Sequence, residues 1–228
     1  MKNLKRLIII PARGGSKRIK DKHIKKFNGK PIIYYSINSA KKSKLFDIIH
    51  VSTESIKIKN FIKEKIKIDF MRPKFLSSDN TPIYKVILNV VNNFKKKMIG
   101  FDEIWCLMPC APNISFKDLI DAANFYKKKR KKLPVYAVSK YRVPIEWSSK
   151  LDKNGILHPL NKRSQMLRSQ DLEDKFYDAG QFYIFPGKEI SKLNFKKNNF
   201  LRYGYTLPFS KSIDIDDQED WNIAEKII

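Results

Sequence analysis

The sequence predicts an α/β protein built on a doubly wound, mostly parallel sheet, and three observations lead to this fold class. Short apolar runs alternate with segments of helical periodicity along most of the chain. The first apolar run, residues 7–10, ends abruptly in a loop with two glycines among basic residues. The 228 residues contain no internal repeat and no linker-like stretch, so we expect one domain spanning 1–228.

Apolar runs and helical spacing define the individual elements. Behind the first strand, Ile33, Ile37 and Ala40 share one face of an expected helix, and a longer apolar face recurs at i, i+3 and i+4 from Ile83 to Phe94. The predicted strands are 7–10, 47–52, 66–71, 102–108, 135–139, 182–185 and 203–207. The predicted helices are 31–42, 58–62, 83–94, a segment opening at Ser115, and a closing helix with Trp221, Ala224 and Ile228.

Two helix starts carry capping signals. Thr81 is the expected N-cap of the helix at 83–94, with Pro82 as its first residue. Ser115 and Asp118 have the spacing of a capping-box relative, which favours a helix that starts at Ser115.

The ligand site is expected at the carboxyl ends of the strands, where open α/β sheets bind their ligands. The loops expected to line one crevice follow Ile10, Ser52, Met71 and Met108. From 141 to 178 the alternation of strands and helices breaks down into an irregular, aromatic and basic segment.

Composition excludes several classes of protein. The net charge is +24, but the basic residues are spread over nearly every segment and no nucleic-acid motif is present, so we expect no specific nucleic acid partner. The charge favours anionic small substrates instead. No apolar run approaches a membrane span or a signal peptide, so the expectation is a cytoplasmic protein without membrane contact. Cys106 and Cys110 are expected to be packing residues.

The loop after the first strand, PARGGSKR at 11–18, is a candidate anion site. Paired glycines let backbone N–H groups such as those of Ala12 and Gly14 approach an anion closely, and Arg13 supplies positive charge. The loop has neither the spacing of a P-loop nor that of a dinucleotide-binding motif. It therefore predicts a site for a phosphate-bearing ligand of another type, and a glycine-rich turn with solvated lysines is the alternative.

Acidic residues gather near the C-terminus. In an extended chain Ile213 and Ile215 would face the core, while Asp214 and Asp216 would project together, roughly 7 Å apart at the backbone. Two carboxylates at that spacing can ligate one Mg²⁺ that bridges to substrate phosphates. With the basic loop, this predicts Mg²⁺-assisted transfer of a nucleotidyl or phosphoryl group.

The same acidic cluster also fits a helix start. Asp216 or Asp217 could serve as the N-cap, and Glu219 and Asp220 would be favoured by the helix dipole. Asp214 lies too early in the sequence for that role. The two interpretations therefore divide the cluster between them.

Taken together, these motifs resemble those of the acylneuraminate cytidylyltransferases, also called CMP-sialic acid synthetases. The resemblance covers essentially the whole chain in the right order. The motifs that carry it are PARGGSKR (11–18), VSTE (51–54), RPKFLSSDNTP (72–82), MPCAP (108–112) and SIDIDDQEDW (212–221). The stretch RSQDLEDKFYDAGQFY (168–183) is most similar to the branch that acts on pseudaminic acid.

The resemblance implies a Rossmann-like fold and a reaction. In this family, CTP and a nine-carbon 2-keto acid sugar give the CMP-sugar and pyrophosphate, with Mg²⁺ as cofactor. The segment after the fifth strand reaches into a partner subunit and helps to close the sugar site. For this chain that implies a homodimer, with 141–178 as the dimerisation segment.

The resemblance also implies residue roles. Arg13 and Lys22 match residues that contact the triphosphate, and both would act in catalysis. Asp214 and Asp216 match the aspartates associated with Mg²⁺, and Asp216 or a metal-bound hydroxide would help to deprotonate the sugar hydroxyl. The residues that match the cytidine-side motif are Arg72, Asp79 and Thr81.

Some positions depart from the family pattern. The fourth strand commonly ends in Gln-Pro-Thr-Ser-Pro, whereas Met108, Cys110 and Ala111 stand here, and the usual Lys-Asn after the basic loop is Lys22-His23. One sugar contact and one nucleotide contact must therefore differ. Candidate sugar contacts are Gln181 and Tyr183, with Arg168 for the sugar carboxylate, and core packing is the alternative for Tyr183.

Alternative functions stay open at this stage. Within the same class, the sugar could be neuraminic acid, legionaminic acid or another ulosonic acid. From other classes, the chain could be a basic nucleic-acid-binding protein or a nucleotide-binding relative without catalysis.

Overall fold

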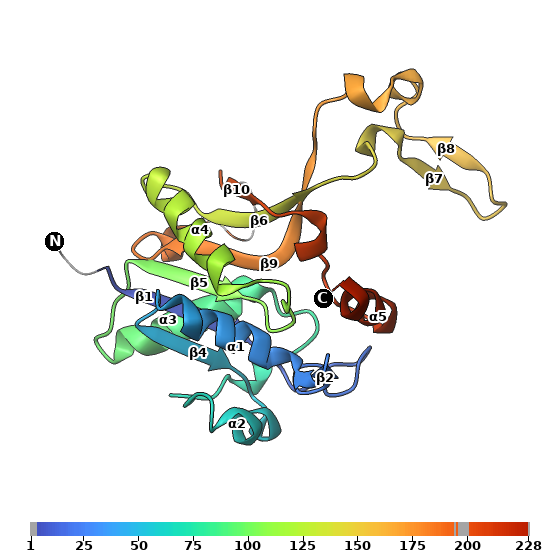
Figure 1. The fold of residues 1–228 in the computed structure, drawn as a ribbon. Helices are drawn as coiled ribbons and strands as arrows, with labels where there is room; N and C mark the ends of the chain where they lie inside the picture. Colours follow the sequence, from blue (N-terminus) through green and yellow to red (C-terminus); the bar gives the residue numbers. More distant parts are fainter. Residues whose placement is uncertain (1–3, 194, 196–200, 228) are drawn as a thin grey trace.

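The computed structural model describes residues 4–193, 195 and 201–227, and its centre is a six-stranded sheet with the order β10-β6-β9-β5-β1-β4 (Figure 1). Its strands are β1 (Arg6–Pro11), β4 (Ile48–Ser52), β5 (Glu103–Leu107), β6 (Val135–Lys140), β9 (Phe176–Pro186) and β10 (Tyr203–Thr206). β1 pairs in parallel with β4 and β5, and β10 pairs in parallel with β6. β9 lies antiparallel between β5 and β6. The predicted α/β fold with a mostly parallel sheet is confirmed.

Helices cover both faces of this sheet. The helices are α1 (Ile32–Ser43), α2 (Ile56–Ile62), α3 (Ile83–Lys96), α4 (Phe116–Lys128) and α5 (Gln218–Ile227). Successive residues of a strand point to opposite faces, so Ile8 and Ile10 pack in the core cluster with residues of α1, α2 and α4, whereas Leu7 and Ile9 pack in the cluster with α3. Burial on both sides explains why the first strand reads as a continuous apolar run.

Short elements connect these layers. Two small antiparallel pairs are β2 (Lys26–Phe27) with β3 (Lys30–Pro31) and β7 (Ser149–Leu151) with β8 (Leu157–Pro159). Single 3₁₀ turns lie at Lys74–Leu76, Ile145–Trp147, Ser164–Met166, Ser169–Asp171, Ile190–Lys192 and Phe209–Lys211.

One predicted helix cap is confirmed and the other is wrong. At the start of α4, Ser115 Oγ accepts a hydrogen bond from the Asp118 amide, and Asp118 Oδ2 accepts one from the Ser115 amide at 2.8 Å, which completes a capping box. At the start of α3, Pro82 occupies the N-cap position and no side chain caps the helix. The Thr81 hydroxyl instead pairs with the Ser78 hydroxyl at 2.8 Å, because a turn brings these two residues together.

The predicted strand at 66–71 is also wrong. β4 is the edge of the sheet, and no strand pairs beyond it among the residues that the structure describes. Ile66 and Ile68 pack against the core on the α1 side, and Phe70 packs against the cluster on the α3 side. The alternation therefore reflects a loop that packs over β4 without pairing to it.

The last helix returns to the N-terminal part of the chain. Trp221 of α5 packs edge to face on Phe27 with ring centroids 5.3 Å apart, and both belong to an apolar cluster that includes Cys110. The predicted closing helix is thus confirmed for Trp221 and Ala224, and Ile228 lies outside the described residues. This packing brings the acidic segment before α5 next to the basic loop after β1.

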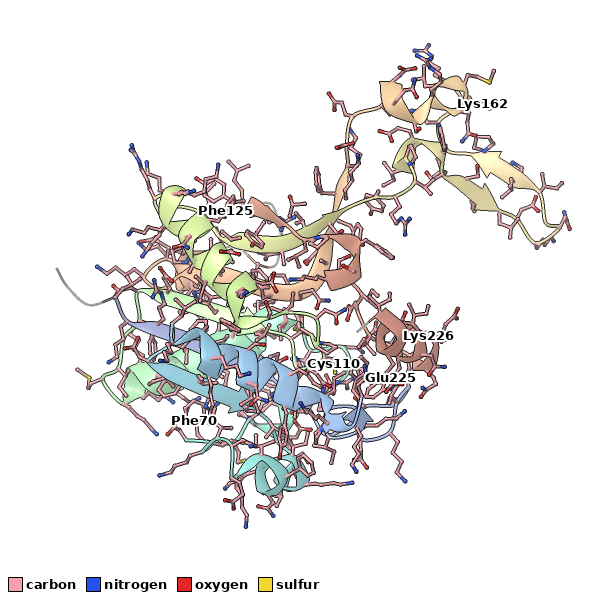
Figure 2. All side chains as sticks on the ribbon, viewed as in Figure 1. Phe70, Cys110, Phe125, Lys162, Glu225 and Lys226 are labelled. Atoms are coloured by element: carbon pink, nitrogen blue, oxygen red, sulfur yellow. The ribbon has the colours of Figure 1, made fainter. Side chains whose placement is uncertain are left out.

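Residues 141–175 form an arm that projects from the body of the molecule, with Lys162 near its far end (Figures 1 and 2). The predicted boundary at 178 is wrong by a few residues, because Phe176–Asp178 already pair with β6 as the first part of β9. Large apolar side chains exposed on the arm include Val143, Ile145, Leu151, Ile156, Leu157, Leu160 and Met166.

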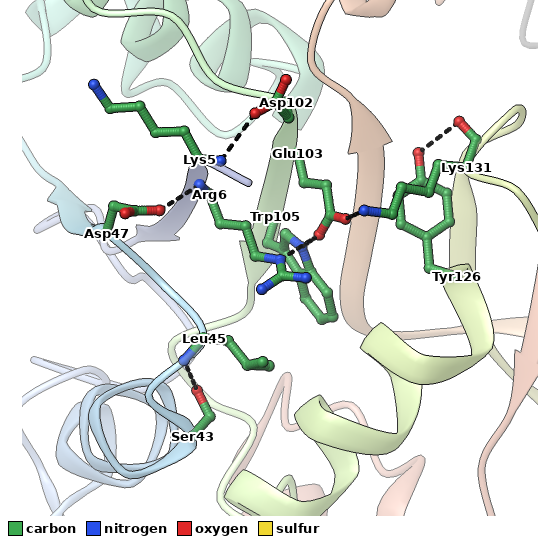
Figure 3. A network of polar contacts seen from close by, with 10 residues as sticks. All are labelled: Lys5, Arg6, Ser43, Leu45, Asp47, Asp102, Glu103, Trp105, Tyr126 and Lys131. Atoms are coloured by element: carbon green, nitrogen blue, oxygen red, sulfur yellow. Dashed lines mark hydrogen bonds and ion pairs between the residues drawn. The ribbon is translucent and has the colours of Figure 1, made fainter. Parts of the chain in front are cut away.

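A buried ion-pair network lies at the amino ends of β1 and β5, whereas the crevice is expected at their carboxyl ends. Figure 3 shows the contacts of this network. The carboxylate of Glu103, at the start of β5, is only 1% exposed. It receives Arg6 Nε at 2.7 Å, Lys131 Nζ at 2.7 Å and the indole N–H of Trp105 at 3.2 Å. Two cations offset one buried charge, so the network links the starts of β1 and β5 to the residues that follow α4.

None of the described helices has the length and apolar character that a membrane crossing requires.

Candidate active site

A basic pocket lies at the carboxyl ends of β1 and β5, as predicted for the crevice. Its volume is about 260 Å³, and we call it the basic pocket. It is lined by Pro11, Arg13, Ser16, Lys17, Arg18, Ile19, Lys22, His23, Arg72, Leu76, Ser78, Asp79, Thr81, Ile83, Val86, Met108, Pro109, Asp214 and Asp216. Seven of the predicted site residues are in this set, from three separate parts of the chain.

The backbone amides predicted to hold a phosphate are engaged within the protein. The Ala12 amide donates to the Ser52 carbonyl at 2.9 Å, and the Gly14 amide donates to Glu54 Oε1 at 2.7 Å. Neither residue lines the basic pocket. A Cβ at Gly14 would lie 2.8 Å from Ser55 Cβ, so the glycine allows the loop to approach the start of α2. The amides of Ala12 and Gly14 therefore do not face the pocket, whereas Arg13, Ser16, Lys17 and Arg18 of the same loop line it.

Arg13 and Lys17 share one carboxylate across the pocket. Asp79 forms an ion pair with Arg13 and another with Lys17 at 2.8 Å. Hydrogen bonds from Lys17 and Arg13 hold the pKa of Asp79 below its ordinary value. An anionic ligand entering here meets two cations whose charge this aspartate only half offsets.

Arg72 is the most deeply buried cation of the pocket, with 6% of its surface exposed. Its Nε donates to Ser52 Oγ at 3.1 Å and its Nη2 donates to the Ser52 carbonyl at 2.6 Å, which ties the segment after α2 to the end of β4. Burial lowers the pKa of the guanidinium from its ordinary value, but a guanidinium keeps its charge in proteins. The loop after Ser52 thus supports the pocket without lining it.

Asp214 and Asp216 both line the pocket opposite the basic loop, while Ile215 is fully buried, as the alternation predicts. Asp216 pairs with Arg18 at 3.0 Å and with Lys22 at 3.6 Å. Asp214 lies exposed at the rim, but partial desolvation and the Asp216 charge raise the pKa of its carboxyl to about 6. The Asp216 charge disfavours ionisation of Asp214, and a cation bound beside both carboxylates would offset that repulsion.

The helix-capping role falls to other residues of the cluster. Asp217 Oδ1 accepts hydrogen bonds from the Glu219 and Asp220 amides at 2.9 and 3.0 Å, so Asp217 is the N-cap of α5. Asp220 Oδ2 accepts from the Asp217 amide at 3.1 Å, which completes the box. The side chains of Asp214 and Asp216 remain for the pocket.

The carboxylate pair fits a magnesium ion. Mg²⁺ prefers one or two protein carboxylates and fills its remaining positions with water and substrate phosphate oxygens. No group of three or more metal-binding side chains occurs among residues 4–193, 195 and 201–227. Two hard oxygen donors beside an anion-binding pocket are the donor set expected of Mg²⁺ bound together with a nucleotide.

His23 and Cys110 form a buried contact that the sequence did not identify as part of the site. Cys110 Sγ lies 3.3 Å from His23 Nδ1, and His23 lines the basic pocket. Burial, with the nearby Lys22 charge, lowers the pKa of His23 to about 3, so the imidazole is neutral at physiological pH. Lys22-His23 follows the basic loop where the family pattern has Lys-Asn, and that departure was the sequence signal that pointed to this position.

None of the three predicted sugar contacts lines the basic pocket. Gln181 is 2% exposed and lines no described pocket, because its side chain bonds to backbone carbonyls of Ala179 and Ile213. Arg168 lies on the arm and pairs with Asp171 at 2.8 Å. Within one copy of the chain, the structure does not bring either residue together with the basic pocket.

Tyr183 lines a second pocket, of about 490 Å³, which we call the adjoining pocket because it shares Ile83 with the basic pocket. The Tyr183 hydroxyl donates to Asp178 Oδ2 at 3.2 Å, and burial raises the pKa of the phenol above its ordinary value. The Tyr183 ring packs against Tyr136 with ring centroids 4.7 Å apart, while its hydroxyl makes the polar contact with Asp178. The other lining residues are Pro82, Tyr84, Ile87, Phe185 and Phe195.

Comparison with known proteins gives a consistent result. A family model described as cytidylyltransferase matches residues 7–101. Pseudaminic acid cytidylyltransferase of Campylobacter jejuni is 33% identical over 227 residues, which cover 97% of this chain and 95% of the relative. CMP-N,N'-diacetyllegionaminic acid synthase of Legionella pneumophila is 26% identical with the same two coverages, 97% and 95%.

The fold of this chain is similar to that of a solved structure. The structure of CMP:2-keto-3-deoxy-manno-octonic acid synthetase complexed with CTP superposes with a TM-score of 0.69 at 13% identity, over 98% of each chain. That identity supports the fold alone. With the full-length relative and the arrangement of the pocket, the family is established: this chain belongs to the cytidylyltransferases and is a nucleotidyltransferase.

Proposed function

We propose that this enzyme transfers CMP from CTP to pseudaminic acid, an acidic nine-carbon 2-keto sugar, and releases pyrophosphate. The observation that carries the reaction class is the basic pocket itself, in which cations on one wall face two carboxylates on the other. The identity of the sugar is supported by the relative from Campylobacter jejuni, which shares 33% of its residues over nearly the whole chain.

The cations suit a triphosphate. Arg13 and Lys22 would bind phosphate oxygens and offset the charge that develops on the α-phosphoryl group and on the departing pyrophosphate. Arg72, whose donors on one side are held by Ser52, would keep its position as the nucleotide enters. Asp79 and Thr81 are proposed to contact the nucleotide from the loop before α3.

Asp214 and Asp216 would hold Mg²⁺, which supplies charge neutralisation for the triphosphate when bound. Asp216 is kept in place by Arg18 and Lys22, so the metal side and the phosphate side of the pocket share one ion-pair network. In the reaction, the anomeric hydroxyl of the sugar attacks the α-phosphorus, the bond to pyrophosphate breaks, and Asp216 is proposed to accept the hydroxyl proton.

The adjoining pocket is our proposed sugar site. It opens next to the basic pocket and combines aromatic walls with the hydroxyl of Tyr183 and the carboxylate of Asp178, a mixture that suits a sugar with both methyl and hydroxyl groups. Gln181 is not included, because its amide donors are taken by the backbone.

A homodimer would complete the site. The arm exposes many large apolar side chains and projects away from the body, which is unfavourable for an isolated chain and favours cover by a second copy. Arg168 on the arm would then reach the sugar carboxylate in the partner's adjoining pocket. The cytoplasmic location stays a prediction.

The decisive experiment is a substrate panel. Purified protein is incubated with CTP, Mg²⁺ and, separately, pseudaminic, N,N'-diacetyllegionaminic, N-acetylneuraminic and 2-keto-3-deoxy-manno-octonic acids, while pyrophosphate release is followed and the CMP-sugar is identified by mass. We expect kcat/KM for pseudaminic acid to exceed the others by roughly tenfold or more. UTP in place of CTP serves as the control for the nucleotide.

Two results would change the proposal. A higher kcat/KM for legionaminic or neuraminic acid would move the assignment to that sugar and keep the reaction. Absence of pyrophosphate release with every acidic sugar would overturn the proposed reaction.

A further inference from the structure

Gln181 joins two walls of the basic pocket from a buried position on β9. Its Nε2 donates to the Ala179 carbonyl at 2.9 Å and to the Ile213 carbonyl at 3.0 Å. Its own carbonyl accepts a hydrogen bond from the Met108 amide at 2.9 Å, at the end of β5. Met108 lines the basic pocket, and Ile213 directly precedes Asp214. One side chain and one peptide group thus fix two walls of the pocket relative to each other.

Gly180 leaves the space that the Asp214 carboxylate occupies. The glycine has a φ of +63°, which disfavours other residues, and a Cβ there would lie 3.0 Å from Asp214 Oδ2 and 3.4 Å from its Cγ. The Gly180 amide donates to Asp178 Oδ1 at 3.0 Å, which holds the backbone in this conformation. A side chain at 180 would push Asp214 away from its place at the pocket rim.

The segment around Asp214 depends on such contacts, because residues 212–216 belong to no helix or strand. The Tyr177 and Ser212 hydroxyls pair at 3.1 Å, and Gln181 holds Ile213 two residues before Ile215 enters the core. Residues of β9 therefore form hydrogen bonds with Ser212 and Ile213, the two residues immediately before Asp214.

We propose that Gln181 and Gly180 are positioning residues that set Asp214 in the metal-binding wall of the basic pocket, and that Gln181 makes no contact with the sugar. This role rests on the proposed function of Asp214 and replaces the sugar contact expected for Gln181. This role explains the sequence Asp-Ala-Gly-Gln at 178–181 by its contacts: Asp178 holds the Gly180 backbone, Gly180 leaves space for Asp214, and Gln181 holds Ile213.

The test uses Gly180→Ala with Gly155→Ala as its matched control. Gly155 also has a left-handed φ, of +80°, but a Cβ there meets nothing within 4 Å. Binding of Mn²⁺ is measured in the presence of CTP and without sugar, from the electron paramagnetic resonance signal of free Mn²⁺. We expect Gly180→Ala to weaken Mn²⁺ binding by about tenfold, a change worth about 1.4 kcal/mol, and Gly155→Ala to leave it unchanged.

A double-mutant cycle separates positioning from general damage. In an Asp214→Ala background, the added methyl at 180 no longer meets a carboxylate, so Gly180→Ala is expected to cause no further loss of Mn²⁺ affinity. Equal losses in both backgrounds, or an affinity of Gly180→Ala equal to that of Gly155→Ala, would overturn the proposal.

Gln181→Met gives an independent variant of similar volume without the amide donors. We expect weaker Mn²⁺ binding and a higher Mg²⁺ requirement for pyrophosphate release, while KM for the sugar stays near the wild-type value. A change confined to the sugar KM would restore Gln181 as a sugar contact and contradict our proposal. Because the Mn²⁺ measurement contains no sugar, failure of the sugar assignment leaves this test intact.

Discussion

The sulfur of Cys110 lies 3.3 Å from Nδ1 of His23 at the wall of the basic pocket. Burial raises the pKa of the Cys110 thiol to about 12, so the sulfur keeps its proton and can donate it to Nδ1. A donor at Nδ1 favours the neutral tautomer of His23 that carries its hydrogen on Nε2 and offers a donor to the pocket that it lines.

The first prediction concerns this tautomer. Cys110→Ala removes the donor to Nδ1 and is expected to raise KM for CTP about fivefold, the effect of losing one ordinary hydrogen bond of about 1 kcal/mol. Cys110→Ser keeps a hydroxyl donor and is expected to stay closer to the wild type. Steady-state kinetics with varied CTP measure the effect, and an unchanged KM in Cys110→Ala would show that the tautomer does not matter for nucleotide binding.

Acid sensitivity is predicted from His50, which is fully buried and stacks on Phe70 with ring centroids 4.3 Å apart. Neither ring nitrogen has a hydrogen-bond partner, and burial lowers the pKa to about 4, against about 6.5 in the unfolded chain. Between these values the unfolded chain binds more protons, so the stability contributed by neutral His50 is complete above pH 6.5 and is lost as the pH falls towards 4.

We expect His50→Phe to remove this dependence. Between pH 7.5 and pH 5 the wild type should lose about 2 kcal/mol more stability than the variant, by linkage at a single site. Urea unfolding at the two pH values measures the difference, and any packing strain from the larger ring cancels because it is present at both. Equal losses in the two proteins would mean that His50 does not set the acid response.

Arg13 and a nearby lysine allow a prediction about the pocket itself. Arg13→Met removes one of the cations proposed to face the nucleotide and is expected to lower kcat/KM for CTP by about 10²-fold or more, as loss of a charge-assisted bond in a transition state does. Lys20→Met is the matched control, because Lys20 is exposed in the same loop and does not line the pocket. Similar losses in both variants would indicate a general effect of net charge, and raised salt would then mimic it.

The sequence predicted those features that depend on local pattern. The apolar run at 7–10 predicted a strand buried on both faces, and the alternation at 213–216 predicted that Asp214 and Asp216 share a pocket. The strand expected at 66–71 failed because periodicity reports which side chains are buried and not whether a neighbouring strand exists to pair with them.

The role of Gln181 depended on contacts between distant segments. The strand predicted at 182–185 began one residue after Gln181, which the structure places within β9, and its partner, the Ile213 carbonyl, lies 32 residues further along the chain. Similarly, the loop amides of Ala12 and Gly14 were available for a phosphate as far as the sequence could tell, and only the fold supplied Ser52 and Glu54 as their acceptors. Such pairings follow from the order of strands in the sheet, which local patterns do not contain.

The adjacent residues Asp216 and Asp217 allow the proposed catalytic role to be tested separately from helix capping. Asp217 caps α5, and Asp217→Asn retains a side-chain oxygen as acceptor, so we choose Asp217→Ala, which should cost about 1 kcal/mol of stability while leaving most of the activity. Asp216→Asn keeps the shape of the side chain but removes the charge that faces Arg18 and Lys22 and that is proposed to hold Mg²⁺. Asp216→Asn should therefore abolish turnover in a folded protein.

Thermal unfolding and pyrophosphate release, measured on both variants, test whether Asp217 acts in capping and Asp216 in the reaction. Near-normal turnover in Asp216→Asn would remove Asp216 from the proposed mechanism, whereas an inactive but stable Asp217→Ala would move the reacting carboxylate one residue along the chain.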